Sequence, residues 1–162
     1  MCRDIHGLDP LVGDAPRVLI LGNMPSVMSL AGGEYYGNPR NAFWRITGSL
    51  FGFDPDAPYP LRVRALGEHA IAVWDVLRSC RRVGSLDSAV DRDSMVSNDF
   101  LSFFGAHPTL ERVVFNGAAA EVNYRRLLGP TPLPSVRLPS TSPAQTMRYE
   151  DKLEAWRRGL TG

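Results

Sequence analysis

The chain is poor in lysine, cysteine and long apolar runs, and each shortage excludes a class of protein. Lysine occurs once, at Lys152, among 18 basic residues. The two cysteines, Cys2 and Cys80, cannot supply a four-thiolate iron–sulfur cluster and form no Cys-x-x-Cys pair for structural zinc. No apolar stretch approaches the ~20 residues that cross a bilayer, and the N-terminus has no signal-peptide pattern. We therefore expect a cytoplasmic protein with neither a structural metal site nor a membrane segment.

Size and charge fit one ordinary globular domain. The chain has 162 residues, of which 44% are hydrophobic, enough for a sizeable core. The three histidines, His6, His69 and His107, are scattered without the spacing of metal ligands. Net charge is only +1, so a nucleic-acid partner would need a local basic patch. We expect a single domain over residues 1–162, with residues 1–16 as an irregular extension.

Short apolar runs alternate with helical patterns along the chain. Such runs are typical of strands that are covered on both faces, and the alternation predicts an α/β sandwich around a mostly parallel sheet. Met147, Leu153, Trp156 and Leu160 form the expected buried stripe of the last helix. The predicted strands are residues 17–21, 70–74, 112–115 and 135–138, and the predicted helices are residues 41–51, 61–68, 98–105, 118–128 and 145–160.

Polar or turn-forming residues follow all four predicted strands. Ligands of such sheets bind beyond the carboxyl ends of the strands, so these segments should meet at one site. The segments are residues 22–26, Asp75, residues 116–117 and residues 139–143. Asp75 could serve as a base, as an acceptor for a base edge or as a helix cap. Nearby Arg78, Arg81 and Arg82 form either a solvated face or a phosphate patch.

The long segment after the first strand contains "YYGNPRNAFW", residues 35–44. Its aromatic pair could be a lid over the core or a platform on which a flat ring stacks. Asn41 could hold a water or a base edge through its amide, or cap the helix that follows. The turn at Gly22-x-x-Pro25-Ser26 could present N–H groups to a ligand or simply end the strand. It matches neither a P-loop nor G-x-G-x-x-G.

The last loop, "LPSTSPAQT" over residues 138–146, places three hydroxyl side chains ahead of a helix. Hydroxyls and helix N-termini are common donors to nucleic-acid phosphates. The alternative is helix capping by Thr141 or Ser142, and both roles can hold together.

These motifs, in this order, resemble the uracil-DNA glycosylase superfamily, with the hypoxanthine-DNA glycosylase family as the best match. The likeness spans about residues 17–156 and rests on Gly-x-x-Pro-Ser, Tyr-Tyr-Gly-Asn-Pro-Arg-Asn-x-Phe-Trp, Trp-Asp-Val, Phe-Asn-Gly and Leu-Pro-Ser-Thr-Ser-Pro-Ala. It implies a three-layer α/β/α sandwich with a four-stranded, mostly parallel sheet. It also implies a monofunctional enzyme that flips a deaminated base, preferably hypoxanthine, out of DNA and excises it without metal or cofactor. We expect the protein to be a monomer. Uracil, xanthine and etheno bases remain alternatives, as does a non-catalytic nucleic-acid-binding module.

Matched position by position, the resemblance implies roles for several residues. Asn41 is the catalytic residue, Tyr36 stacks on the everted base and Asn116 contacts its edge. The resemblance also implies Ser140, Thr141 and Ser142 at the DNA backbone and Pro143, Ala144 and Gln145 as the wedge. From their places around the strand ends we further expect Gly22, Asn23, Met24 and Asp75 at the base and Pro25, Ser26 and Arg40 at the DNA backbone.

Two positions depart from the patterns of related families. Met24 stands where mismatch-specific thymine/uracil relatives have a water-activating Asn, and Leu138 stands where uracil-specialised relatives have a His. Both departures argue against a strong uracil glycosylase and favour Asn41 as the catalytic residue. A lyase would need an amine nucleophile. Because Lys152 lies in the predicted last helix, away from the strand ends, we expect simple hydrolysis.

Overall fold

The central element is a four-stranded parallel sheet in the order β3-β2-β6-β7, seen in a computed structural model that describes residues 4–161. Its strands are β2 (Val18–Gly22), β3 (Ile71–Asp75), β6 (Arg112–Asn116) and β7 (Ser135–Leu138). Every residue of β2 is buried, as its unbroken apolar sequence predicts for a central strand. All four strands were predicted to within one residue at each end.

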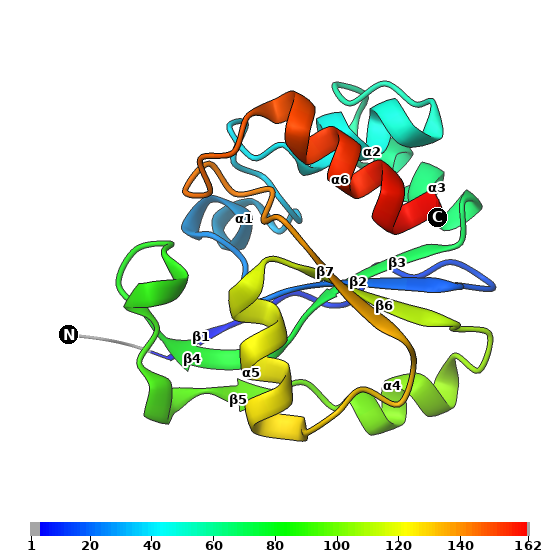
Figure 1. Ribbon diagram of the computed structural model, residues 1–162. Coiled ribbons are helices and arrows are strands. Elements are labelled where there is room, and N and C mark those ends of the chain that lie inside the picture. The colour runs from blue at the N-terminus through cyan, green and yellow to red at the C-terminus, as the bar shows by residue number, and fades with distance from the viewer. Residues whose placement is uncertain (1–3, 162) are drawn as a thin grey trace.

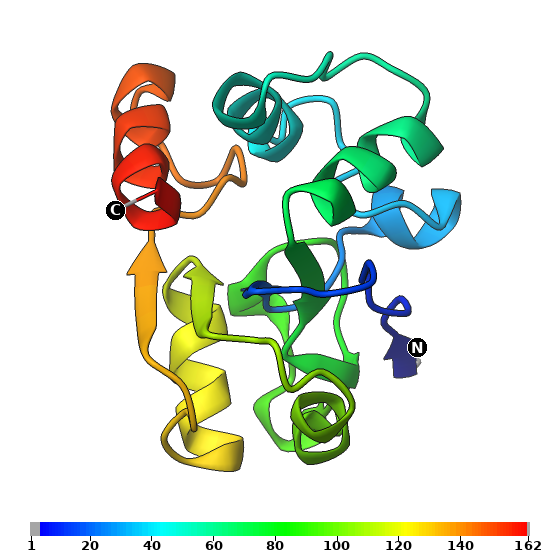
Figure 2. The ribbon, with the colours of Figure 1, turned by 90° about the vertical axis from the view of Figure 1, so that its right-hand side faces the viewer.

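Helices cover both faces of this sheet and complete the predicted three-layer α/β/α sandwich (Figure 1). One face carries α2 (Phe43–Phe51), α3 (Tyr59–Glu68) and α6 (Tyr149–Thr161). The other face carries α4 (Phe100–Ala106) and α5 (Ala118–Leu128). Figure 2, turned by 90°, shows the helices on either side of the strands. A short helix that was not predicted, α1 (Val27–Gly32), follows β2.

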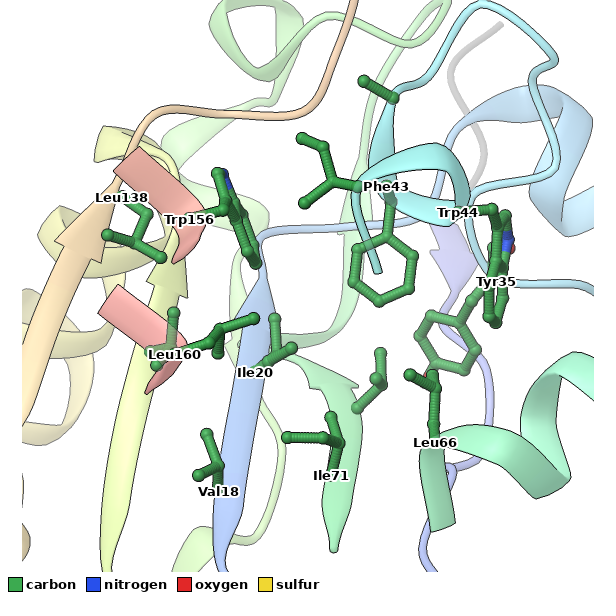
Figure 3. Packing of buried hydrophobic residues seen from close by; sticks show 14 residues of the cluster. Val18, Ile20, Tyr35, Phe43, Trp44, Leu66, Ile71, Leu138, Trp156 and Leu160 are labelled. Carbon is green, nitrogen blue, oxygen red and sulfur yellow. The ribbon is translucent and has the colours of Figure 1, made fainter. Parts of the chain in front are cut away.

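The core beneath α2, α3 and α6 also positions the loops at the carboxyl end of the sheet. Phe43 and Trp156 are fully buried there, with ring centroids 6.3 Å apart in an edge-to-face contact (Figure 3). The indole N–H of Trp156 donates to the Pro139 carbonyl at 2.8 Å, and that of Trp44 donates to the Tyr35 carbonyl at 2.9 Å. Two large core side chains therefore hold the two loops that carry the predicted site.

A second, antiparallel sheet was not predicted. It has the order β1-β4-β5, from β1 (Asp4–His6), β4 (Leu77–Arg81) and β5 (Val96–Ser97). Two single-turn 3₁₀ helices, η1 (Asp87–Ala89) and η2 (Arg92–Ser94), lie between β4 and β5. Residues 4–6, which were expected to be irregular, thus form an edge strand on β4. Cys2 lies outside the described residues, and Cys80 is buried.

The last helix begins four residues later than predicted. A turn intervenes in which the Gln145 N–H donates to the Ser142 carbonyl at 3.1 Å, with Pro143 second in the turn. The Gln145 side chain then accepts from the Met147 N–H at 2.6 Å. Met147 is 40% exposed, so its place in the buried stripe was wrongly predicted, whereas Trp156 and Leu160 are buried.

Candidate functional site

The loops after all four parallel strands surround a cavity of about 380 Å³. Of the residues predicted for the site, all but Gln145 line it. The topology accounts for this convergence, because parallel strands end at the same edge of a sheet. Volumes of this size are typical of pockets for small ligands.

Asn41 lies in the cavity wall and also caps α2. Its Oδ1 accepts from the Phe43 backbone N–H at 2.9 Å, which a nitrogen could not do, so the orientation of the amide is fixed. Within residues 4–161 its NH₂ group has no hydrogen-bond partner. The two roles left open for Asn41 are therefore compatible, since one half of the amide caps the helix and the other half is available to a ligand.

Tyr36 is held in a conformation that side chains rarely adopt. Its φ is +54°, in the left-handed region, and such strain persists only where surrounding contacts enforce it. Its ring stacks on Phe43 with centroids 4.0 Å apart. Its hydroxyl accepts from Asn116 Nδ2 at 3.1 Å. Contacts at both ends of the side chain therefore fix the ring in the cavity wall.

Asn116 joins three segments around the floor of the cavity. Its Oδ1 accepts from the Thr141 backbone N–H at 2.9 Å, and its Nδ2 donates to Thr141 Oγ1 at 3.0 Å as well as to Tyr36. Both amide hydrogens of Asn116 thus form hydrogen bonds within the protein. A contact to a ligand would have to replace one of these two hydrogen bonds. Thr141 is only 1% exposed and directs its hydroxyl inward.

Asp75 is a buried acid at the end of β3, 4% exposed. Burial, with a smaller contribution from the negative charge of Asp87, raises its pKa to about 7, against an opposing effect of Arg82. Its Oδ2 has no partner within the described residues. The chain continues from Asp75 into β4, so the capping role is excluded.

Asn23 and Met24 face different surroundings although both border the cavity. The Asn23 amide donates to Asp87 Oδ1 at 3.1 Å and accepts from Asn123 Nδ2 at 2.9 Å. It therefore ties the first turn to both η1 and α5. Met24 is buried in the core between the sheet, α4 and α5.

One wall of the cavity was not predicted. It consists of Ser85, Leu86 and Asp87, and the Ser85 hydroxyl accepts from the Val27 N–H at 2.9 Å. Buried Arg82 supports this wall by donating to the carbonyls of Pro25 at 2.6 Å and Gly84 at 2.7 Å. These contacts depend on the unforeseen strand β4, and no local sequence pattern indicates them.

The last loop forms a compact turn over Lys152. The hydroxyls of Ser140 and Ser142 accept from the backbone N–H groups of Ser142 and Ala144 at 3.1 and 3.2 Å. Lys152 Nζ donates to the carbonyls of Ser142 at 3.1 Å and Gln145 at 2.7 Å. Lys152 was expected to lie away from the strand ends, but it is 4% exposed and supports this loop from α6. Lys152 lies in the first turn of α6, which begins at Tyr149, and this places the Lys152 side chain under residues 142–145.

Among residues 4–161 there is no group of three or more His, Cys, Asp or Glu side chains that could hold a metal ion. No helix in that range is long and apolar enough to span a membrane.

Comparison with known proteins gives two curated relatives and a solved structure. The chain is 32% identical over 152 residues to hypoxanthine DNA glycosylase of Methanosarcina acetivorans, covering 93% of this chain and 94% of the relative. It is 34% identical over 113 residues to the protein of the same name from Methanosarcina barkeri, covering 69% and 70%. A solution NMR structure from Methanosarcina acetivorans, named as a candidate uracil DNA glycosylase, matches with a TM-score of 0.79 at 30% identity, covering 96% and 98%. No protein-family model matches the chain.

Proposed function

Because the chain belongs to the hypoxanthine-DNA glycosylase family of the uracil-DNA glycosylase superfamily, we propose that it everts a deaminated nucleotide from DNA and hydrolyses its N-glycosidic bond, with hypoxanthine as the preferred base. The chain is a DNA glycosylase, and the proposal concerns its substrate and the roles of its residues. Both curated relatives carry the name of a hypoxanthine glycosylase.

The available NH₂ group of Asn41 in the cavity wall is the observation that carries this proposal. Cleavage breaks the bond between C1′ of the sugar and the base nitrogen, and the electron pair leaves with the base. A water oxygen then adds to C1′ and releases its proton to solvent. An amide is too weak a base to deprotonate that water, but it can orient it, and orientation lowers such barriers substantially.

The rest of the cavity would bind the everted nucleoside. Tyr36, supported from behind by Phe43, offers a rigid ring for stacking, which contributes about 1–3 kcal/mol per base. Asn116 would contact the base edge by giving up its bond to the Tyr36 hydroxyl. Gly22, Asn23 and Met24 complete the surface at the base.

The loops around the cavity mouth would hold the DNA strand. Pro25, Ser26 and Arg40 line the cavity from the segment between β2 and α2, and Ser140 and Ser142 line it from the loop after β7. Thr141 acts there through Asn116, because its own hydroxyl is directed inward. The turn at Pro143 and Ala144, followed by Gln145, would enter the space that the everted base vacates.

Uracil is the second candidate substrate, because the solved relative is named as a candidate uracil DNA glycosylase. Met24 and Leu138 argue for a weaker activity on uracil, since neither side chain can polarise water or stabilise an oxyanion.

An excision panel tests the proposal. Duplexes that contain deoxyinosine, deoxyxanthosine, deoxyuridine or 1,N6-ethenodeoxyadenosine are incubated with the wild type, and base release is measured under single-turnover conditions. We expect the fastest release from deoxyinosine. We expect Asn41→Ala to lower that rate by about 100-fold or more, because the water loses its orientation.

Asn41→Ser is the matched control for helix capping. A serine at this position can still accept from the Phe43 N–H. The Asn41→Ser protein should therefore be more stable than the Asn41→Ala protein, but its excision rate should be as low. Undiminished excision by either variant would refute the catalytic role of Asn41. Absence of base release from all four lesions by the wild type would refute the proposed activity itself.

A further inference from the structure

We propose, on the premise of the proposed function, that Asp75 acts in its protonated form and donates a hydrogen bond to a carbonyl oxygen of the everted base. The substrate class is then the lactam bases, in which a ring N–H adjoins a carbonyl group. Hypoxanthine, xanthine and uracil share this edge, and ethenoadenine does not.

The backbone of Asp75 is fixed by the sheet. Asp75 is paired with Gly22 in the parallel register of β2 and β3, and its carbonyl accepts from Asn98 Nδ2 at 2.8 Å. A Cβ on Gly22 would lie 2.5 Å from Asp75 Oδ1 and 3.2 Å from the Tyr36 hydroxyl. The carboxyl group therefore occupies the space directly over Gly22, beside Tyr36 in the cavity wall. Its Oδ2 is fully buried without a partner within the described chain, so Oδ1 is the oxygen that can meet a ligand.

The groups that face Asp75 favour its neutral form. Asp87 of η1 adds negative charge, Tyr36 and Tyr35 add neutral hydroxyls, and Arg82, which follows β4, is the opposing cation. Arg82 forms no ion pair with Asp75, since its guanidinium donates to the carbonyls of Pro25 and Gly84 instead. Burial dominates the balance and raises the pKa of Asp75 to about 7.

A neutral carboxyl group can donate to the carbonyl oxygen of a lactam, whereas a carboxylate cannot. The neutral group carries an O–H donor, and the lactam carbonyl oxygen is its acceptor. A carboxylate could accept from the ring N–H, but it would repel the carbonyl oxygen of the base. Negative charge grows on that oxygen as the glycosidic bond breaks, so the hydrogen bond from Asp75 strengthens in the transition state and accelerates the reaction.

This role predicts the opposite pH dependence from that of a general base. A base must be ionised, so its rate would rise through the pKa of Asp75, whereas a donor fails as it ionises. Asp75→Asn separates the two cases, because an amide of similar shape keeps a donor and an acceptor at every pH.

The first experiment measures single-turnover release of hypoxanthine between pH 5.5 and 9 by the wild type and by Asp75→Asn. Asp56→Asn is the matched control, because Asp56 is an exposed acid that does not line the cavity. We expect the wild-type and Asp56→Asn rates to fall about tenfold per pH unit above ~7, and the Asp75→Asn rate to stay within about twofold over that range. A wild-type rate that rises through pH 7, or the same fall in Asp75→Asn, would overturn the proposal.

The second experiment does not depend on base release. Binding is measured to duplexes that contain 2′-fluoro-2′-deoxyinosine, whose glycosidic bond resists cleavage, against duplexes with ethenodeoxyadenosine. Wild-type affinity for the inosine analogue, relative to undamaged DNA, should weaken about tenfold between pH 6.5 and 8.5, and affinity for the etheno duplex should not. Asp75→Asn should lose this pH dependence while it remains at least as thermally stable as the wild type. Equal pH dependence for both lesions would contradict the role of Asp75, even in a protein that released no base.

Discussion

At the scale of single residues, the site depends on a glycine and an acid at paired positions. Gly22 has no side chain, and the carboxyl group of Asp75 fills the space that a methyl group would take. That acid costs stability whenever it is ionised, because it is buried and no cation of residues 4–161 is bonded to it. A group that contributes to binding is thus expected to weaken the fold at alkaline pH.

Asp75 should make the protein less stable as pH rises. Its pKa is raised from 3.8 to about 7 on folding, so the folded state binds a proton that the unfolded state releases within this interval. The free energy of unfolding should therefore fall by about 1.4 kcal/mol per pH unit between ~4 and ~7 from this group alone. Asp75→Asn should remove that component and be more stable than the wild type at pH 8.

Urea unfolding at pH 5, 6.5 and 8 measures this difference. The stability gained by Asp75→Asn should grow with pH, and Asp56→Asn should show no such trend. A gain that is the same at all three pH values would mean that Asp75 stays ionised in the folded protein.

At the scale of secondary-structure elements, the parallel sheet and its helices were predictable and the antiparallel sheet was not. The runs at Val18–Gly22 and Arg112–Asn116 are apolar because both faces are covered, and that pattern is local. The central strand of the antiparallel sheet, Leu77–Arg81, mixes buried and exposed residues and pairs with Asp4–His6, more than seventy positions away. No short-range signal encodes such a pairing.

The same distinction holds for the site. Asp75, Asn116 and Ser140 were predicted together because each ends or closely follows a parallel strand. The wall at Ser85–Asp87 was missed because it rests on β4 and on Arg82. The position of Lys152 was missed because α6 begins at Tyr149, after a turn, and not at residue 145 as predicted. Lys152 therefore lies in the first turn of the helix, next to the loop at the strand ends.

Helix α6 supports the last loop through one ammonium group, so Lys152→Met should disturb the site more than the fold. Methionine keeps most of the buried volume but leaves the Ser142 and Gln145 carbonyls without their donor. We expect affinity for lesion-containing DNA to weaken about tenfold, which corresponds to about 1.4 kcal/mol, the loss expected for a hydrogen bond from a charged group. Fluorescence anisotropy with labelled duplexes measures this change.

The control for this variant is its thermal unfolding, which should shift by only a few degrees because the apolar packing of α6 is retained. A variant that bound lesion DNA as tightly as the wild type would show that residues 142–145 hold their shape, or make their contacts, independently of Lys152.

At the scale of the whole molecule, a net charge of +1 provides little general attraction to DNA. Many arginines are engaged in ion pairs, among them Arg17 with Glu111 and Arg157 with Glu154. Arg40 is exposed at the cavity and has no ion pair within residues 4–161. Binding should therefore depend on few phosphate contacts, concentrated at the carboxyl end of the sheet.

The salt dependence of binding tests this distribution. Each phosphate contact contributes about −0.9 to the slope of log K against log salt concentration, so Arg40→Ala should make the slope about 0.9 shallower. Arg64→Ala is the matched control: Arg64 is also exposed, but it lies on α3 near Ala70 and Ile71, where β3 begins, at the opposite end of the sheet. Its slope should equal that of the wild type. If Arg64→Ala flattened the slope as much as Arg40→Ala did, DNA would contact both ends of the sheet. The cavity at the carboxyl end would then no longer define where the duplex lies.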